Sequence, residues 1–130
     1  MNTNHGSALA ARRVHWIARG ISAFVAAFWL LISIAEAIGE PDPWTWQSWM
    51  MAGLITSSTM GVIVAWWKEG IGGAIVIACA IAHSTFAAIV AGHNKILAVL
   101  ISGGPYLLIG ALFLVSWRLS NHPATKRERT

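Results

Sequence analysis

Four apolar stretches dominate this chain, and each is long enough to cross a lipid bilayer. They cover residues 17–38, 49–67, 71–91 and 96–117, so each contains 19–22 residues. A membrane-spanning helix needs about 20 mostly apolar residues, and helices in the cores of soluble domains seldom reach that length. The links between the stretches are short and leave too few residues for a soluble domain. The sequence therefore predicts an all-α fold, an integral membrane four-helix bundle.

Composition supports this fold class and excludes a nucleic-acid-binding function. Hydrophobic residues make up 56 % of the chain and charged residues only 11 %, whereas soluble domains carry about 25 % charged residues. The formal charge of +4 comes from basic residues that flank the apolar stretches, without a basic stripe of interleaved aromatics. Such flanking charges are typical of topology signals or of contacts with anionic lipid headgroups. We therefore expect the lipid bilayer as a partner and no nucleic acid.

The distribution of the basic residues predicts the orientation in the membrane. Eight of the 9 Lys and Arg residues lie in the terminal regions, at the start of the first stretch or in the link 68–70, and only Lys95 lies on the opposite side. The positive-inside rule then places both termini and the 68–70 link in the cytoplasm. This predicts a cytoplasmic tail at 1–16, a four-span domain at 17–117 and a basic cytoplasmic tail at 118–130. The expected location is the inner (plasma) membrane, as a multi-pass protein.

Tryptophan placement agrees with these span limits. Of the 8 tryptophans only Trp29 lies deep within a predicted span. An indole ring is stable at the headgroup level, where its face is buried and its N–H stays hydrated. The tryptophans at predicted span ends are Trp16, Trp44, Trp46, Trp49, Trp66, Trp67 and Trp117.

The first stretch also resembles a secretory signal peptide. Arg12 and Arg13 precede it, and the residues at 35–37 match an A-x-A cleavage site. The apolar run is longer than the usual stretch of about 7–15 residues, so we expect a retained first helix. The single cysteine, Cys79, is expected to pack as a small apolar residue.

Small residues spaced by four predict how the helices pack, since small side chains let helix backbones approach closely in lipid. Two stretches carry such a seam, and the three-residue link between them requires an antiparallel hairpin. The seam residues are Gly53, Ser57 and Gly61 in the second stretch and Ala80, Ser84 and Ala88 in the third. We expect both seams to lie within the hairpin; alternatively, one of them faces another subunit.

The link between the second and third stretches carries the most distinctive motif of the chain. Gly70 can adopt the left-handed conformation of a helix cap, and Gly72 and Gly73 permit a close approach of backbones. Residues 65–73 resemble the A-W-x-x-E-G-x-G-G signature of a family of small uncharacterised four-span membrane proteins from bacteria and archaea. The residues that carry this resemblance are Trp66, Glu69, Gly70, Gly72 and Gly73. The resemblance implies a four-span architecture and no activity.

A layer of polar residues is expected near the middle of the bilayer, where each polar group is costly. Depth matching across the links sets His83 level with Thr56 or Ser57 and with Gly104. The predicted layer contains Thr56, Ser57, His83, Ser102, Gly104 and Pro105. We expect a neutral His83 that is hydrogen-bonded to Thr56 or Ser57; alternatively, the layer lines a small polar cavity. No two histidines share a depth on different stretches, so no haem between two histidines and no other cofactor is expected.

A second polar group is expected at the opposite, outer membrane surface. Glu36, Glu40, Asp42 and His93 lie near the outer ends of their stretches. We expect solvated interfacial side chains there; alternatively, they form an entry site for a proton or a cation. The spacing matches no known metal-ligand pattern, so no metal site is expected.

The expected function is non-catalytic, because the chain has no motif for a phosphate, a metal, a nucleophile or a cofactor. The sequence favours an accessory or assembly subunit, or a scaffold, of a larger membrane complex, with other membrane subunits or self-association as partners. The alternative is a small oligomeric transporter or proton-linked carrier that acts through the layer around His83. A membrane redox or lipid enzyme is a third class, for which no group of catalytic residues stands out.

Overall fold

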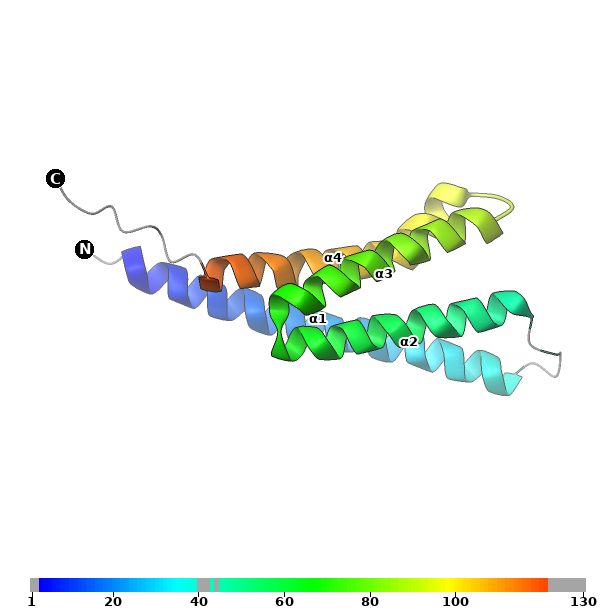
Figure 1. Ribbon diagram of the computed structural model, residues 1–130, viewed down its shortest axis with the longest axis horizontal. Helices are drawn as coiled ribbons and strands as arrows, with labels where there is room; N and C mark the ends of the chain where they lie inside the picture. Colours follow the sequence, from blue (N-terminus) through cyan, green and yellow to red (C-terminus); the bar gives the residue numbers. More distant parts are fainter. Residues whose placement is uncertain (1–2, 40–42, 44, 122–130) are drawn as a thin grey trace.

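The computed structural model describes residues 3–39, 43 and 45–121 of the chain. They form four α-helices: α1 (Thr3–Gly39), α2 (Trp46–Trp67), α3 (Glu69–Val90) and α4 (Lys95–Asn121). The helices run along the long axis of the molecule, and the start of α1, the α2–α3 turn and the end of α4 lie toward one end (Figure 1). All four are long and apolar enough to cross a membrane. The predicted all-α architecture with four candidate membrane spans is therefore confirmed.

The helices extend further than the apolar stretches that predicted them. α1 begins at Thr3, so most of the predicted N-terminal tail is helical, and α4 continues to Asn121. The apolar stretch marks only the part that suits the bilayer, while good helix formers such as Ala8, Ala10 and Ala11 continue the helix beyond it. At about 1.5 Å per residue, the part of α1 before residue 17 projects roughly 20 Å beyond the predicted span.

Local hydrogen bonds fix the ends of α2 and the start of α3. Thr45 caps α2, and its hydroxyl accepts a hydrogen bond from the N–H of Ser48 at 3.4 Å. A single residue, Lys68, separates α2 from α3; its N–H donates to the carbonyl of Val64 at 2.7 Å. Its carbonyl in turn accepts from the N–H of Gly72 at 2.9 Å. The regular hydrogen bonds of α2 therefore continue up to Lys68, and those of α3 begin at the same residue.

The expected left-handed cap at Gly70 is wrong. Gly70 lies in the first turn of α3, and no described glycine has a positive φ. The positive φ of 53° belongs to Asn94, in the link between α3 and α4. Asparagine tolerates this conformation because its short polar side chain forms local hydrogen bonds. Gly70 instead allows a close approach of α4, since a Cβ there would lie 3.0 Å from the indole of Trp117.

α3 and α4 share the most extensive interface, followed by α2 with α3, while α1 packs less extensively on α4 and α2. The core contains apolar side chains from all four helices. Its buried members are Ala18, Val62, Ala65, Val76, Ala80, Tyr106, Ile109 and Phe113. In a bilayer this packing depends on close van der Waals contact rather than on the exclusion of water.

The two seams of small residues do not face each other. On α2 only Gly61 is closely packed, because a Cβ there would lie 2.9 Å from Cγ2 of Ile75 on α3. Gly53 and Ser57 are exposed, and a Cβ on Gly53 would meet nothing within 4 Å.

The seam of α3 faces α4 instead. A Cβ on Gly103 would lie 2.7 Å from the carbonyl oxygen of Ala80 and would overlap the hydroxyl of Ser84. Ala88, the last seam residue, is half-buried. The seam of α3 therefore packs against α4, the helix with which α3 shares its largest interface.

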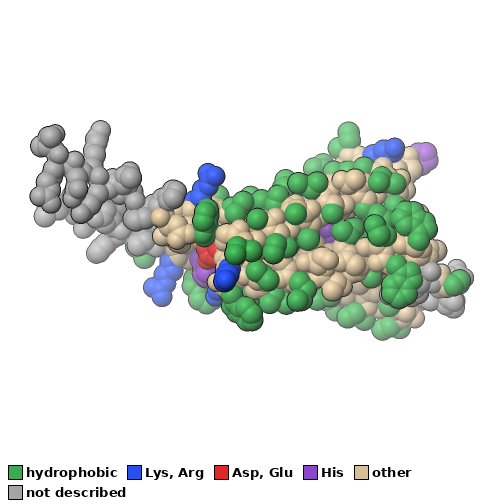
Figure 2. Space-filling model, viewed as in Figure 1, with side chains coloured by type: hydrophobic (Ala, Val, Ile, Leu, Met, Phe, Trp, Pro, Cys, Tyr) green, Lys and Arg blue, Asp and Glu red, His purple; other side chains and the backbone are tan. Residues whose placement is uncertain are grey.

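The surface of the bundle suits a bilayer. Hydrophobic side chains cover the visible face along its length, and most of the visible Lys and Arg side chains gather toward the end with the α2–α3 turn (Figure 2). The described tryptophans at the predicted span ends are all exposed, whereas Trp29 is half-buried. Trp44 lies outside the described residues.

Candidate functional site

A buried polar cluster occupies the middle of the bundle, and His83 is its centre. The side chain of His83 is only 1 % exposed. Its Nε2 lies 3.1 Å from the hydroxyl of Ser58, which itself donates to the carbonyl of Leu54 at 2.8 Å. Because the hydroxyl has only one hydrogen, the network assigns the ring proton to Nε2, which donates to Ser58. Nδ1 of His83 then holds a lone pair that has no partner among the described residues.

α4 completes this cluster. The ring of Tyr106 stacks on His83 with centroids 5.0 Å apart and planes inclined by 15°. Tyr106 is fully buried, and its hydroxyl has no hydrogen-bond partner among the described residues. The hydroxyl of Ser102 donates to the backbone carbonyl of His83 at 3.5 Å. We call Ser58, His83, Ser102 and Tyr106 the central polar cluster.

The sequence predicted the depth of this cluster but not all of its members. Thr56 and Ser57 are exposed on α2, and the hydroxyl of Thr56 donates to the carbonyl of Ala52 on its own helix. The partner of His83 is Ser58 instead, because successive residues of a helix point about 100° apart. Gly104 and Pro105 are half-buried in α4, which continues through the proline. They lie beside the cluster without a hydrogen bond to His83 among the described side chains.

Tyr106 is not among the site residues predicted from the sequence, although the sequence carries a signal for it. It is the single tyrosine of the chain, and it follows Pro105 directly in the predicted layer. A tyrosine within an apolar span indicates a specific role, since its hydroxyl is costly to bury without a hydrogen-bond partner.

The predicted outer group is not assembled among the described residues. Glu36 is exposed near the end of α1, and His93 is exposed in the link between α3 and α4. No hydrogen bond or ion pair joins these two side chains. Glu40 and Asp42 lie outside the described residues, so the predicted group of four stays a prediction.

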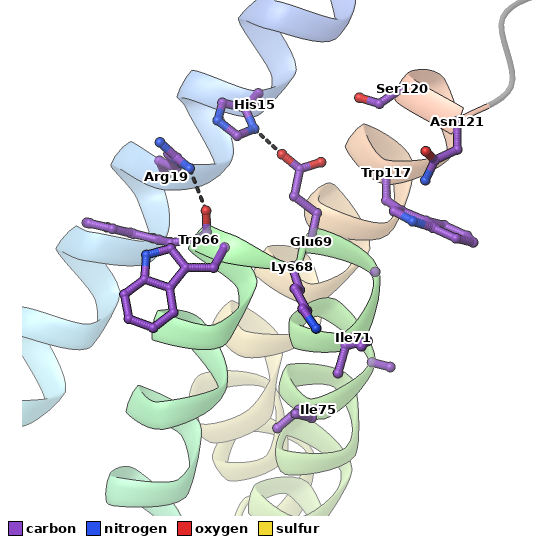
Figure 3. Close-up of a pocket in the computed structure, with 13 residues that line it drawn as sticks. His15, Arg19, Trp66, Lys68, Glu69, Ile71, Ile75, Trp117, Ser120 and Asn121 are labelled. Carbon is purple, nitrogen blue, oxygen red and sulfur yellow. Dashed lines mark hydrogen bonds and ion pairs between the residues drawn. The ribbon is translucent and has the colours of Figure 1, made fainter.

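An open cleft of about 850 Å³ lies at the end of the bundle that carries the α2–α3 turn (Figure 3). We call it the turn-end cleft. Its polar lining comes from α1, the turn and the last residues of α4, namely His15, Arg19, Lys68, Glu69, Ser120 and Asn121. Its apolar lining includes Trp66, Ile71, Ala74, Ile75 and Trp117. The cleft therefore combines charged groups with an apolar wall.

Three polar contacts tie α1 to the turn beside the turn-end cleft. His15 and Glu69 point toward each other, and Nδ1 of the imidazole pairs with Oε1 of the carboxylate (Figure 3). Arg19 donates through Nη2 to the carbonyl of Trp66, and its guanidinium lies 5.8 Å from the centroid of the indole ring. The indole N–H of Trp66 donates to the hydroxyl of the fully buried Ser22 at 3.2 Å. Together these contacts hold the turn against α1.

The five motif residues of the turn contact three different helices. Trp66 and Glu69 bind α1 through the contacts described above. Gly70 and Gly73 approach α4, where added Cβ atoms would lie 3.0 Å from Trp117 and 3.2 Å from the carbonyl of Gly110. Gly72 lies against the backbone of Ala65 on α2, with no room for a Cβ. The motif therefore docks the turn onto the other three helices.

The α1 side of this site could have been found from spacing. His15, Arg19 and Ser22 are four and three residues apart, which places them on one face of a helix. Buried Ala18 and Ala26 lie on the same side of α1. The sequence alone indicates only a topology signal at Arg19, because a positive charge at a span end is typical of the cytoplasmic side.

Comparison with known proteins gives a family. The family described as "Domain of unknown function (DUF7670)" matches residues 6–129 of the chain. The chain belongs to this family. No curated protein and no solved structure matches it. The family match agrees with the expected resemblance to a small uncharacterised membrane protein, and its description names no activity.

For this member of the DUF7670 family, the geometry limits the chemistry that each place supports. The central polar cluster offers an acceptor at His83 and a donor at Tyr106, but both side chains are buried. The turn-end cleft is open and offers the cations of Arg19 and Lys68 beside the His15–Glu69 pair. Among the described side chains, no three His, Cys, Asp or Glu residues come together as metal ligands would.

Proposed function

We propose that this chain is a non-catalytic integral membrane protein that serves as an accessory or assembly subunit, or as a scaffold, of a larger membrane complex. The observation that supports this proposal is the sparse cover of α1. Within the most apolar 18 residues of each span, 11 % are buried for α1, against 28 % for α2, 28 % for α3 and 33 % for α4. Most of the surface of α1 is therefore not covered by the other three helices.

The exposed side of α1 has the pattern of a helix-packing face. Phe24, Phe28, Leu31, Ile34 and Ile38 are all exposed, and they follow one another at intervals of three or four residues. Residues at this spacing form a stripe along one side of a helix. A stripe of large apolar side chains suits the side chains of a neighbouring membrane helix as well as lipid. We propose that another subunit covers this stripe.

A proton-linked carrier is the second candidate, and the central polar cluster favours it. An unpaired acceptor on His83 and an unpaired hydroxyl on Tyr106 lie in the middle of the bundle. Polar groups inside a membrane mark proton and substrate pathways in many transporters. The 1 % exposure of His83 argues for a structural role, because a carrier must connect its central site to water on each side in turn.

We also propose that both termini face the cytoplasm and that the host membrane is the plasma membrane of a prokaryotic cell. Arg19, Lys68 and Arg118 lie at the end of the bundle with the turn, and Lys95 lies in the link at the opposite end. The positive-inside rule supports the cytoplasm for the first of these ends.

Site-specific cross-linking in native membranes tests the subunit proposal. A photoreactive residue at Leu31, on the exposed stripe of α1, should give an adduct with one defined membrane protein. Leu107 is the matched control, since it is similarly exposed on α4. The same protein should co-purify with the chain in mild detergent.

Liposome flux distinguishes the two candidates. The purified chain alone should support no flux driven by a pH gradient. If it does support such a flux, and His83→Gln folds normally but abolishes it, the carrier replaces the accessory subunit. Adducts with lipid alone at both positions 31 and 107 would also contradict the proposed subunit contact.

A further inference from the structure

The turn-end cleft has the size and the mixed lining of a site for an amphiphile. Its volume of about 850 Å³ falls within the range of about 300–1,000 Å³ that is typical of small-ligand sites. Lys68, Ile71 and Ile75 follow one another along one side of the turn and α3, so a cationic group is succeeded by two apolar side chains (Figure 3). A ligand with a polar head and an apolar tail matches this order.

The charges that face the cleft favour an anion. Among the described residues, four titratable side chains line it: His15, Arg19, Lys68 and Glu69. The carboxylate of this group, Glu69, is already paired with His15. Arg19 donates to one carbonyl, and the ammonium group of Lys68 has no hydrogen bond or ion pair among the described residues. The free charge in the cleft is therefore positive.

The first turn of α3 adds to this preference. The first N–H groups of a helix have no partner within the helix, and the helix dipole places partial positive charge there. Glu69, Gly70 and Ile71 are the first residues of α3, and all three line the cleft.

The position of the cleft along the spans corresponds to the lipid headgroups. Trp66, Trp67 and Trp117 line it, and tryptophan is enriched at the headgroup level. Ala74 and Ile75 lie one turn of α3 further into the span. The change from cations to apolar side chains therefore runs in the same direction as the change from phosphate to acyl chain in a phospholipid.

We propose that the turn-end cleft binds one anionic phospholipid, with its phosphate at Arg19 and Lys68 and the start of an acyl chain along Ile71 and Ile75. Charge complementarity identifies the headgroup, and the apolar wall identifies the bilayer as its source. This inference is independent of the subunit role proposed above, since a carrier would have the same cleft.

Quenching of tryptophan fluorescence tests this proposal, because three tryptophans line the cleft. The full-length chain is delipidated in detergent and titrated with phosphatidylglycerol or phosphatidylcholine that carries brominated acyl chains. Phosphatidylglycerol should quench at the lower concentration. Lys68→Gln should weaken its apparent affinity about fivefold, the factor expected for one basic residue near an anionic lipid surface.

Lys95→Gln is the matched control, since it removes the same charge from an exposed lysine at the opposite end of the bundle. It should leave the affinity for phosphatidylglycerol unchanged. An equal loss in both variants would overturn the proposal, because it would show general attraction to anionic lipid without a site. Displacement of the lipid by millimolar glycerol phosphate would instead show a site for a soluble anion. Equal quenching by both lipids would show that charge does not select the ligand.

Discussion

Replacement of Gly72 by alanine tests the closest helix contact in the bundle. A Cβ at this position would overlap the Cα and the amide nitrogen of Ala65 on α2. These are backbone atoms, so no change of rotamer relieves the overlap, and α2 and α3 must move apart. Gly72→Ala should therefore destabilise the chain even though alanine favours a helix.

A comparison with Gly53→Ala gives the size of the effect. Overpacking of a well-packed interior costs about 1–3 kcal/mol, and a clash between backbones belongs at the upper end. The change from glycine to alanine within a helix contributes about 1 kcal/mol in the opposite direction. Gly53 gains the same helix propensity, but a Cβ there meets nothing within 4 Å. The difference in the free energy of unfolding between the two variants is therefore the packing cost, about 3 kcal/mol.

Reversible unfolding by sodium dodecyl sulfate in mixed micelles measures this difference, with far-ultraviolet circular dichroism as the readout. Gly53→Ala should be as stable as the wild type or slightly more stable, and Gly72→Ala should unfold at clearly lower detergent fraction. Gly70→Ala should fall between them, because its Cβ meets the indole of Trp117, a side chain that can shift. Equal stability of Gly72→Ala and Gly53→Ala would refute the close approach of α2 and α3 at the turn.

Three further predictions concern packing, the central polar cluster and orientation. Gly61→Leu should destabilise the chain by about 2 kcal/mol, because α3 side chains occupy the space beside it; an unchanged melting temperature in detergent would show that this residue faces lipid. His83→Gln should retain most of the stability, since its amide can donate to Ser58. His83→Leu should lower the free energy of unfolding by about 1 kcal/mol, because this hydrogen bond is lost. Identical melting temperatures of the two variants would contradict a structural role for the hydrogen bond. Reporter fusions after Arg118 should be cytoplasmic and fusions within residues 41–45 external; the reverse result would refute the predicted orientation.

The four candidate spans followed from the sequence because a bilayer requires helices of a certain length. Each helix contains an apolar stretch of about the length that the hydrocarbon core requires. The ends of the helices were less predictable, since hydropathy does not indicate whether a helix continues into water. For example, α1 begins at Thr3, well before the first apolar stretch.

The direction in which each side chain points was not available from depth alone. Thr56, Ser57 and Ser58 lie at nearly the same depth, and only the rotation of α2 about its axis decides which of them faces His83. The neighbour of the small-residue seam around Ala80 also depends on the rotation of its helix. The short link suggested that this seam faces α2, but it packs on Gly103 of α4.

The sequence by itself determined the all-α class, the number of candidate spans and the level at which His83 meets α2. These depend on composition and on position along one helix, which a linear pattern records. Tertiary structure alone decided that Glu69 pairs with His15, that Gly72 meets Ala65 and that Tyr106 stacks on His83. Such contacts join residues far apart in the sequence or on different helices, and they depend on how each helix rotates against its neighbours. In a membrane that rotation is set by the shape of the packed side chains, because lipid and protein surfaces are equally apolar.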